Sequence, residues 1–207
     1  MFIPLHSGIA NRKRHHYHFS MGKGSLIILS GPSGVGKGTV RKRLTELEGM
    51  NFYFSVSMTT RSPRNGEIHG KDYFFVTQDE FRRNIAAGNF LEWAEFVGNC
   101  YGTPRDIAES YLENGIDVLL EIETNGARQV LAKCPDAVSI FLVPPSFEAL
   151  EARIRGRSTE DEETIQRRLA KARAELELAS MYRYVVVNDD LDRAAEEIRS
   201  IILAQHK

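Results

Sequence analysis

A glycine-rich turn between a buried strand and a helix constrains this chain more than any other segment. Residues 25–30 read SLIILS, a short apolar run without alternation, which is typical of a parallel strand buried on both faces. Residues 31–39 read GPSGVGKGT, and residues 39–48 have the apolar spacing of a helix. Glycines at such a turn let backbone N–H groups face a phosphate, and the helix N-terminus adds partial positive charge. We therefore predict a phosphate cradle made by Gly31, Pro32, Ser33, Gly34, Val35, Gly36, Lys37, Gly38 and Thr39.

The lysine of this turn predicts a triphosphate ligand, which we take to be ATP. Lys37 supplies a mobile full charge for the terminal phosphates. The serine or threonine that usually follows this lysine and holds Mg²⁺ is replaced by Gly38, and Thr39 comes next. The same Gly-Lys-Gly-Thr string occurs in nucleotide kinases such as adenylate kinase. We expect Mg²⁺ to be held through the substrate phosphates, and the sequence leaves contacts from Thr39 and, through water, from Glu121 as open alternatives.

Strand-like and helix-like segments alternate along the rest of the chain. Residues 117–122, 139–143 and 184–187 read as further buried strands, with helical spacing at 125–133, 146–154, 165–179 and 194–203. This pattern predicts an α/β fold of the P-loop NTPase type, a parallel sheet flanked by helices, with core segments 22–55, 105–152 and 171–207. Residues 56–104 and 153–170 interrupt the alternation, so we expect an inserted acceptor-binding subdomain and a mobile lid. Thr103 is predicted to cap a helix that begins at Pro104.

Composition excludes several other classes of protein. The 207 residues suffice for one sizeable core, and the formal net charge of −1 provides no field that would recruit nucleic acid. The sequence contains no apolar run near the ~18 residues that span a bilayer. Cys100 and Cys134 make neither a disulfide framework nor a zinc site, which favours a cytoplasmic protein. A homo-oligomer remains open.

The first 21 residues differ from the rest of the chain. They contain no acid, and they combine three consecutive basic residues, 12–14, with four histidines. The apolar start precedes the basic residues, which is the reverse of the order in a signal peptide. We expect residues 1–21 to be a disordered, dispensable extension, with metal binding by the histidines or a basic nucleic-acid arm as the alternatives.

A second string of residues predicts the phosphate acceptor's site. Arg61 and Arg64 flank Pro63, and two guanidiniums at this spacing can form forked hydrogen bonds to a dianion. The string Ser57-Met-Thr-Thr-Arg-Ser-Pro-Arg64, followed by Gly66-Glu67, Gly70 and Asp72-Tyr73, resembles the guanylate kinase family. The resemblance covers about residues 22 to 206.

The resemblance implies a role for each matching position around GMP. It implies that Arg61, Arg64, Tyr73 and Tyr101 hold the phosphate of GMP. It gives Glu92 the carboxylate role toward guanine, with hydroxyls from Ser57 and Thr103. Guanine offers an N1–H and a 2-amino group to a carboxylate, whereas adenine offers neither, so AMP should be rejected by about 10⁴-fold. Glu123 stands where the family usually has Asp, near guanine and the metal-coordinated phosphates.

The resemblance extends to the ATP side. Arg157, after Arg153 in the lid string, is expected to pack on adenine and Arg168 to reach the transferring phosphoryl group. Asn188 is expected to hydrogen-bond adenine. The expected catalytic residues are therefore Lys37, Arg61, Arg157 and Arg168. Glu121 either contacts Mg²⁺ through water or only supports the phosphate loop.

The implied reaction is direct transfer of the γ-phosphoryl group from ATP to GMP, with Mg²⁺ and without a covalent intermediate. We expect dGMP to serve as an acceptor too. The first alternative is a kinase for AMP, UMP or dTMP. The second is a guanylate-kinase-like scaffold module that binds peptides and has lost catalysis, although such modules typically have degraded phosphate loops and this chain retains Lys37.

Overall fold

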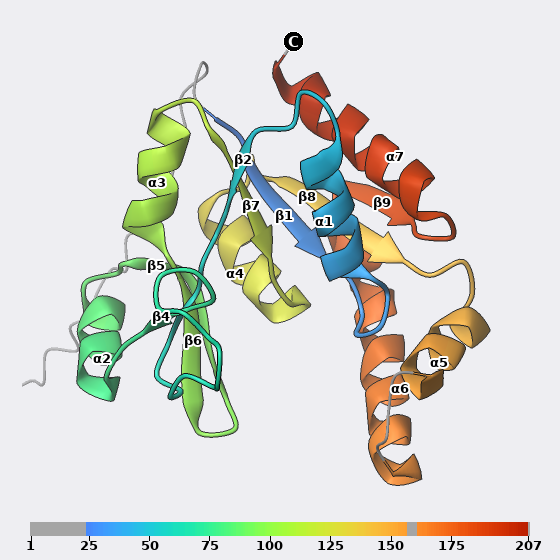
Figure 1. Cartoon of the computed structure of the whole chain (residues 1–207), viewed down its shortest axis with the longest axis horizontal. Helices are drawn as coiled ribbons and strands as arrows, with labels where there is room; N and C mark the ends of the chain where they lie inside the picture. Colours follow the sequence, from blue (N-terminus) through green and yellow to red (C-terminus); the bar gives the residue numbers. More distant parts are fainter. Residues whose placement is uncertain (1–23, 157–160, 207) are drawn as a thin grey trace, which may run out of the picture.

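A parallel sheet of five strands forms the centre of the molecule (Figure 1). The structure is a computed structural model that describes residues 24–156 and 161–206, so the predicted extension 1–21 and Arg157 lie outside the described residues. The strand order is β2-β7-β1-β8-β9, and all four pairings are parallel, as the alternating pattern predicts. The strands are β1 (Leu26–Ser30), β2 (Phe52–Phe54), β7 (Asp117–Glu121), β8 (Val138–Val143) and β9 (Tyr184–Val187).

Both faces of the central strand β1 are buried, because its alternate residues enter two separate apolar clusters. Ile27 and Leu29 pack with α1 (Lys37–Glu46) and α7 (Leu191–Leu203). Leu26 and Ile28 pack on the other face with α3 (Arg105–Glu113) and α4 (Thr124–Lys133). The two pairs of helices enclose the sheet in Figure 1. The run SLIILS lacks alternation because neither of its faces meets water.

The register of the central strands brings three strand ends to one edge. Leu29 of β1 pairs with Glu121 of β7, and Ser30 pairs with Phe141 of β8. The glycine turn that follows β1 therefore starts beside the last residue of β7. Ligands bind at this carboxyl edge in open parallel sheets.

A second sheet lies between β2 and α3 in the sequence. Its order is β4-β3-β6-β5, and its members are β3 (Met58–Thr59), β4 (Phe74–Phe75), β5 (Phe90–Phe96) and β6 (Asn99–Pro104), accompanied by α2 (Gln78–Ala86). The predicted cap at Thr103 is wrong. Strand β6 continues through Pro104, which is itself the N-cap of α3, and the hydroxyl of Thr103 donates to Glu92 instead.

Helices α5 (Phe147–Gly156) and α6 (Glu162–Leu176) form an arm beside the sheet (Figure 1). Short 3₁₀ turns at Glu177–Met181 and Ala204–His206 follow α6 and α7. Strand β9 is only partly buried, contrary to expectation, because it is an edge strand and leaves Val185 46% exposed. Among the described residues, no helix is long and apolar enough to cross a membrane.

We predict that truncating a central strand residue destabilises the fold. Ile140 of β8 is fully buried, so Ile140→Ala should lower the free energy of unfolding by about 2–5 kcal/mol through lost burial and a residual cavity. Val185→Ala on the exposed edge should change it by less than about 0.5 kcal/mol. Urea unfolding measures both, and equal losses would contradict the placement of these strands.

Candidate active site

The turn after β1 has the backbone shape of a phosphate cradle. Gly31, Gly34 and Gly36 have φ angles of +152°, +84° and +101°, a region that side chains disfavour. A Cβ atom on Gly31 would lie 2.6 Å from the backbone oxygen of Leu142. A Cβ atom on Gly36 would lie 2.7 Å from the side-chain nitrogen Nδ2 of Asn188. Gly36 is also the N-cap of α1 and provides no side-chain acceptor. The N–H groups of the first turn are thus available to an anion.

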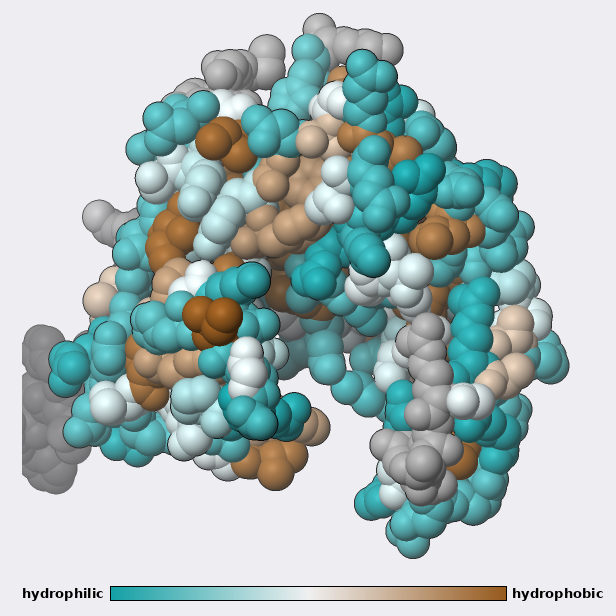
Figure 2. Space-filling model, in the orientation of Figure 1, coloured by the Kyte–Doolittle hydropathy of each residue, from teal (hydrophilic) through white to brown (hydrophobic). Residues whose placement is uncertain are grey.

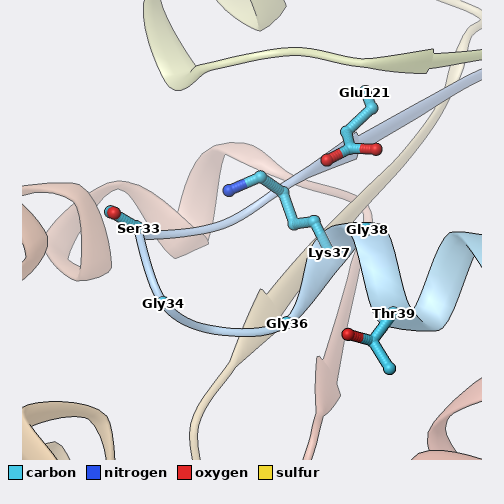
Figure 3. A pocket seen from close by; sticks show the side chains of 7 residues that line it. All are labelled: Ser33, Gly34, Gly36, Lys37, Gly38, Thr39 and Glu121. Carbon is cyan, nitrogen blue, oxygen red and sulfur yellow. The ribbon is translucent and has the colours of Figure 1, made fainter. Parts of the chain in front are cut away.

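The predicted loop residues line a cavity of about 380 Å³ (Figure 3). Its lining comprises Ser33, Gly34, Gly36, Lys37, Gly38, Thr39 and Glu121. The ammonium of Lys37 donates to the backbone oxygens of Gly31 at 2.5 Å and Pro32 at 3.3 Å. In Figure 3, Glu121 extends toward Lys37, whereas the side chain of Thr39 lies on the other side of the helix start. Of the two proposed metal contacts, Glu121 is therefore the one whose side chain points toward Lys37.

Acidic side chains surround the buried end of Lys37. A neighbouring cavity of about 190 Å³ is lined by Lys37 together with Glu121, Glu123, Lys171 and Glu175, among others. Burial lowers the pKa of Lys37, and the charges of these three carboxylates oppose that shift. Lys171 lies 3.0 Å from Glu123 and 3.7 Å from Glu175, measured between ammonium and carboxylate atoms. This mixed-charge cluster joins α6 to the phosphate loop.

Side chains from the arm and from the end of β9 hold the loop in place. The amide nitrogen of Asn188 donates to the backbone oxygen of Val35 at 2.8 Å. Arg153 donates to the same oxygen at 3.2 Å and to the backbone oxygen of Asn188 at 2.9 Å. Arg168 of α6 donates to the hydroxyl of Ser33 at 3.1 Å. Asn188 and Arg168 thus lie against the loop, and their contacts with adenine and phosphoryl group stay predictions.

Glu92 and Thr103 form a buried polar pair between neighbouring strands. The hydroxyl of Thr103 donates to Oε1 of Glu92 at 2.6 Å, and the two residues are directly opposed in the β5–β6 ladder. Glu92 is 8% exposed and Thr103 is 1% exposed. Burial raises the pKa of Glu92, although the hydrogen bond from Thr103 opposes the shift. A buried carboxylate of this kind favours a ligand that brings its own N–H donors.

The predicted phosphate residues gather around Arg61. Its guanidinium contacts Oε1 of Glu67 at 2.8 Å and lies 5.4 Å from the ring centre of Tyr73. A hydrogen bond with Tyr101 also helps to raise the pKa of Arg61, after the larger effect of Glu67. Glu67 accepts in addition from the backbone N–H of Arg64 at 2.7 Å, so one carboxylate orders both arginine positions. The structure therefore brings Arg61, Tyr73 and Tyr101 together, with the exposed Arg64 beside them.

Helix α4 links the two halves of the site. Its N-cap, Glu123, lines the cavity of Lys37, and three residues later a Cβ atom on Gly126 would lie 2.9 Å from Oε2 of Glu92. Ser57 immediately precedes β3, the strand beside β6. Figure 2 shows the surface deeply hollowed between the lobe of the second sheet and the arm of α5 and α6. The glycine turn and the Glu92–Thr103 pair thus share one region of the molecule.

Sequence reasoning missed several polar residues of this region. Glu67 lies within the acceptor string and has no predicted role, although an acid three residues after Arg64 in a turn could indicate a partner for the arginines. Lys171 and Glu175 resemble a solvated helical pair at i, i+4. Their proximity to Lys37 depends on the packing of α6, for which the sequence carries no local signal.

We predict that Glu92 lowers stability near neutral pH. Its pKa in the folded state lies above the usual 4.5, so the unfolded chain binds fewer protons and stability falls as pH rises from that value. Glu92→Gln should therefore be more stable than the natural protein near neutral pH, and this advantage should vanish below pH 4.5. Urea unfolding at both pH values tests this. The exposed Glu95→Gln on the same strand is the control and should show no such pH-dependent gain.

Comparisons with known proteins agree with this geometry. The family model described as guanylate kinase matches residues 23–205. A guanylate kinase of Bacillus subtilis (strain 168) is 52% identical over 184 residues, covering 89% of this chain and 90% of the relative. A crystal structure of guanylate kinase from Anaplasma phagocytophilum is 38% identical, with a TM-score of 0.69 and coverage of 89% of this chain and 87% of that one. The chain therefore belongs to the guanylate kinase family, the nucleoside monophosphate kinases that transfer a phosphoryl group from ATP to GMP.

Proposed function

We propose that this chain carries out the family's reaction, ATP + GMP to ADP + GDP, with both nucleotides end to end in the hollow between the second sheet and the arm. The supporting observation is the buried Glu92–Thr103 pair beside the first turn of α4. The N-cap of the same helix, Glu123, lines the cavity of Lys37. One short helical segment thus connects a base pocket to a phosphate cradle.

The phosphates of ATP bind at the glycine turn. The backbone N–H groups of the turn and of the first turn of α1 surround them, and Lys37 exchanges its contacts with Gly31 and Pro32 for phosphate oxygens. Arg168 needs only a small movement, because it already contacts Ser33 in that turn. Asn188 contacts adenine through atoms other than the amide proton given to Val35. Arg157 completes this side from the lid, residues 153–170.

The phosphate of GMP binds at Arg61, Arg64, Tyr73 and Tyr101. Arg61 is already oriented by Glu67 and by the ring of Tyr73, so little side-chain entropy is lost when the dianion arrives. Guanidinium groups also suit forked hydrogen bonds to phosphate oxygens. These contacts place the acceptor oxygen for attack on the γ-phosphorus.

The base is selected by Glu92 with Thr103 and Ser57. The carboxylate accepts from the N1–H and 2-amino groups of guanine while Thr103 holds its other oxygen. Adenine would leave the buried acid without these donors. The contacts named for base and phosphate do not involve the ribose 2′-hydroxyl, which supports dGMP as a second acceptor.

Transfer itself requires positioning and positive charge, and no residue forms a covalent intermediate. Lys37, Arg61, Arg157 and Arg168 stabilise the charge that develops on the transferring group. Within residues 24–156 and 161–206, no three His, Cys, Asp or Glu side chains have the arrangement of a protein-only metal site. The oxygen of Glu121 beside Lys37 suits a water-mediated contact with Mg²⁺, which keeps several waters when bound. When bound, Mg²⁺ would supply charge neutralisation at the phosphates of ATP.

Two further features belong to this proposal. Residues 56–104 act as the acceptor-binding subdomain, and the lid completes the contacts of its arginines with the phosphates only after both substrates are bound, which limits hydrolysis of ATP by water. The location is cytoplasmic, which the free thiols of Cys100 and Cys134 support.

We predict that Lys37→Met lowers kcat by about 10²–10³-fold, because a charge aimed at the transferring phosphates is lost. Lys42→Met, at an exposed position of the same helix, is the matched control and should retain activity. A coupled assay of ADP release measures both. An unchanged kcat in folded Lys37→Met would refute the role given to this lysine.

We predict that GMP is turned over at least about 10³-fold more efficiently than AMP, and that Glu92→Gln loses most of this preference. The assay compares kcat/KM for GMP, AMP, UMP and dTMP with ATP and Mg²⁺. A preference for one of the other acceptors would favour a different nucleotide kinase. Failure to bind ATP in calorimetry would favour a peptide-binding scaffold module.

A further inference from the structure

Two side chains of α4 hydrogen-bond the backbone of β5 on both sides of Glu92. Gln129 accepts from the N–H of Trp93 at 3.2 Å and donates to the carbonyl oxygen of the same residue at 3.0 Å. The ammonium of Lys133 donates to the carbonyl oxygens of Phe90 at 2.9 Å and Leu91 at 2.7 Å. Four backbone groups of β5 are thus hydrogen-bonded by the side chains of Gln129 and Lys133, which both belong to α4.

These bonds matter because β5 is an edge strand. The order β4-β3-β6-β5 gives it a strand partner on one side only. Backbone groups on the other side need partners, which a neighbouring strand would normally supply. Here Gln129 and Lys133 replace that strand, and they do so at the residues that flank Glu92.

A third contact comes from the same face of α4. A Cβ atom on Gly126 would lie 2.9 Å from Oε2 and 3.3 Å from Cδ of Glu92, so the glycine lets the carboxylate approach the helix backbone. Gln129 and Lys133 follow Gly126 by three and seven residues, a spacing that places all of them on one side of a helix. This face of α4 therefore contacts both the strand and the carboxylate.

We propose that Gln129 and Lys133 are specificity-positioning residues, which fix β5 against the core and thereby set the place at which Glu92 meets the acceptor's base. The inference rests on the proposed role of Glu92 as the guanine acceptor. Neither residue touches the substrate. Both act through the strand that carries the carboxylate, and the charge of Lys133 in addition favours the ionised form of Glu92. A shift of about 1 Å in such a group can lower the reaction rate by a factor near 10².

Loss of the hydrogen bonds from Gln129 and Lys133 to β5 should not unfold the core. Ala127 and Val130 bury α4 against the sheet independently of Gln129 and Lys133. Strand β5 also keeps its ladder with β6, from Phe90↔Pro104 to Phe96↔Asn99. Proteins with Gln129 or Lys133 substituted should therefore fold, but the position of the Glu92 side chain should be less restricted.

The test compares Gln129→Met with Arg128→Met, both in the full chain. The first substitution keeps side-chain length and removes two hydrogen bonds, and the second changes an exposed residue at the preceding position of α4. We expect Gln129→Met to raise KM for GMP by about tenfold and to reduce the preference for GMP over AMP by a similar factor. KM for ATP should stay as in the natural protein. Amide exchange of Trp93, followed by NMR, should accelerate only in Gln129→Met.

Lys133 provides a second, independent pair. Lys133→Met should reproduce the loss of GMP preference, and Lys133→Arg should restore much of it because donors remain at that position. If Gln129→Met does not fold, this pair decides the question through the same ratio of GMP to AMP turnover.

The proposal is overturned if Gln129→Met and Lys133→Met both keep the preference for GMP over AMP that Arg128→Met shows. It is also overturned if KM for ATP and KM for GMP rise equally, since that pattern indicates a general loss of structure. These outcomes differ from failure of the proposed function itself. In that case the natural protein would show no preference for GMP, or Glu92→Gln would leave the preference intact.

Discussion

The site depends on the parallel register of β7, β1 and β8, which brings three strand ends to one edge of the sheet. Leu29 faces Glu121 across the ladder, so the glycine turn after β1 and the acid that ends β7 lie side by side without any further fold element. Helix α4 starts three residues after Glu121 and reaches the second sheet at Gly126. Strand pairing in the core thus fixes the distance between phosphate cradle and base pocket, while the sequence of each turn fixes the chemistry of its own end.

Both ends of the site hold a cationic side chain that already has a partner within the protein and that can exchange this partner for a phosphate. The ammonium of the half-buried Lys37 lies near carboxylates and donates to two backbone oxygens. At the other end Arg61 is paired with Glu67. Burying unpaired charges would be costly, so these internal partners stabilise the site and leave the cations oriented for anionic ligands. Glu92 differs, since burial raises its pKa and hydrogen bonds from Thr103 only oppose that shift.

Local patterns in the sequence predicted the parallel sheet, the phosphate turn and the segments that surround it, because these depend on apolar periodicity and glycine placement. The end of β6 was mispredicted, since Thr103 has the signature of a helix cap but pairs with Glu92 across the ladder. Strand β9 was expected to be buried, yet its place at the sheet's edge follows from strand order, which no local pattern encodes. The contacts of Lys171, Glu175 and Gln129 were missed for a related reason, as they join helices to distant loops and strands. The roles assigned to all the predicted site residues toward ligands stay predictions.

A crystal structure with adenosine and guanosine joined through a phosphate chain would test the central claim most directly, because one molecule must then occupy both halves of the hollow. We predict that the phosphate chain lies in the turn from Gly31 to Lys37 and extends to Arg61, with guanine against Glu92 and Thr103. Guanine bound elsewhere on the surface, or a phosphate chain that avoids Lys37, would contradict the account.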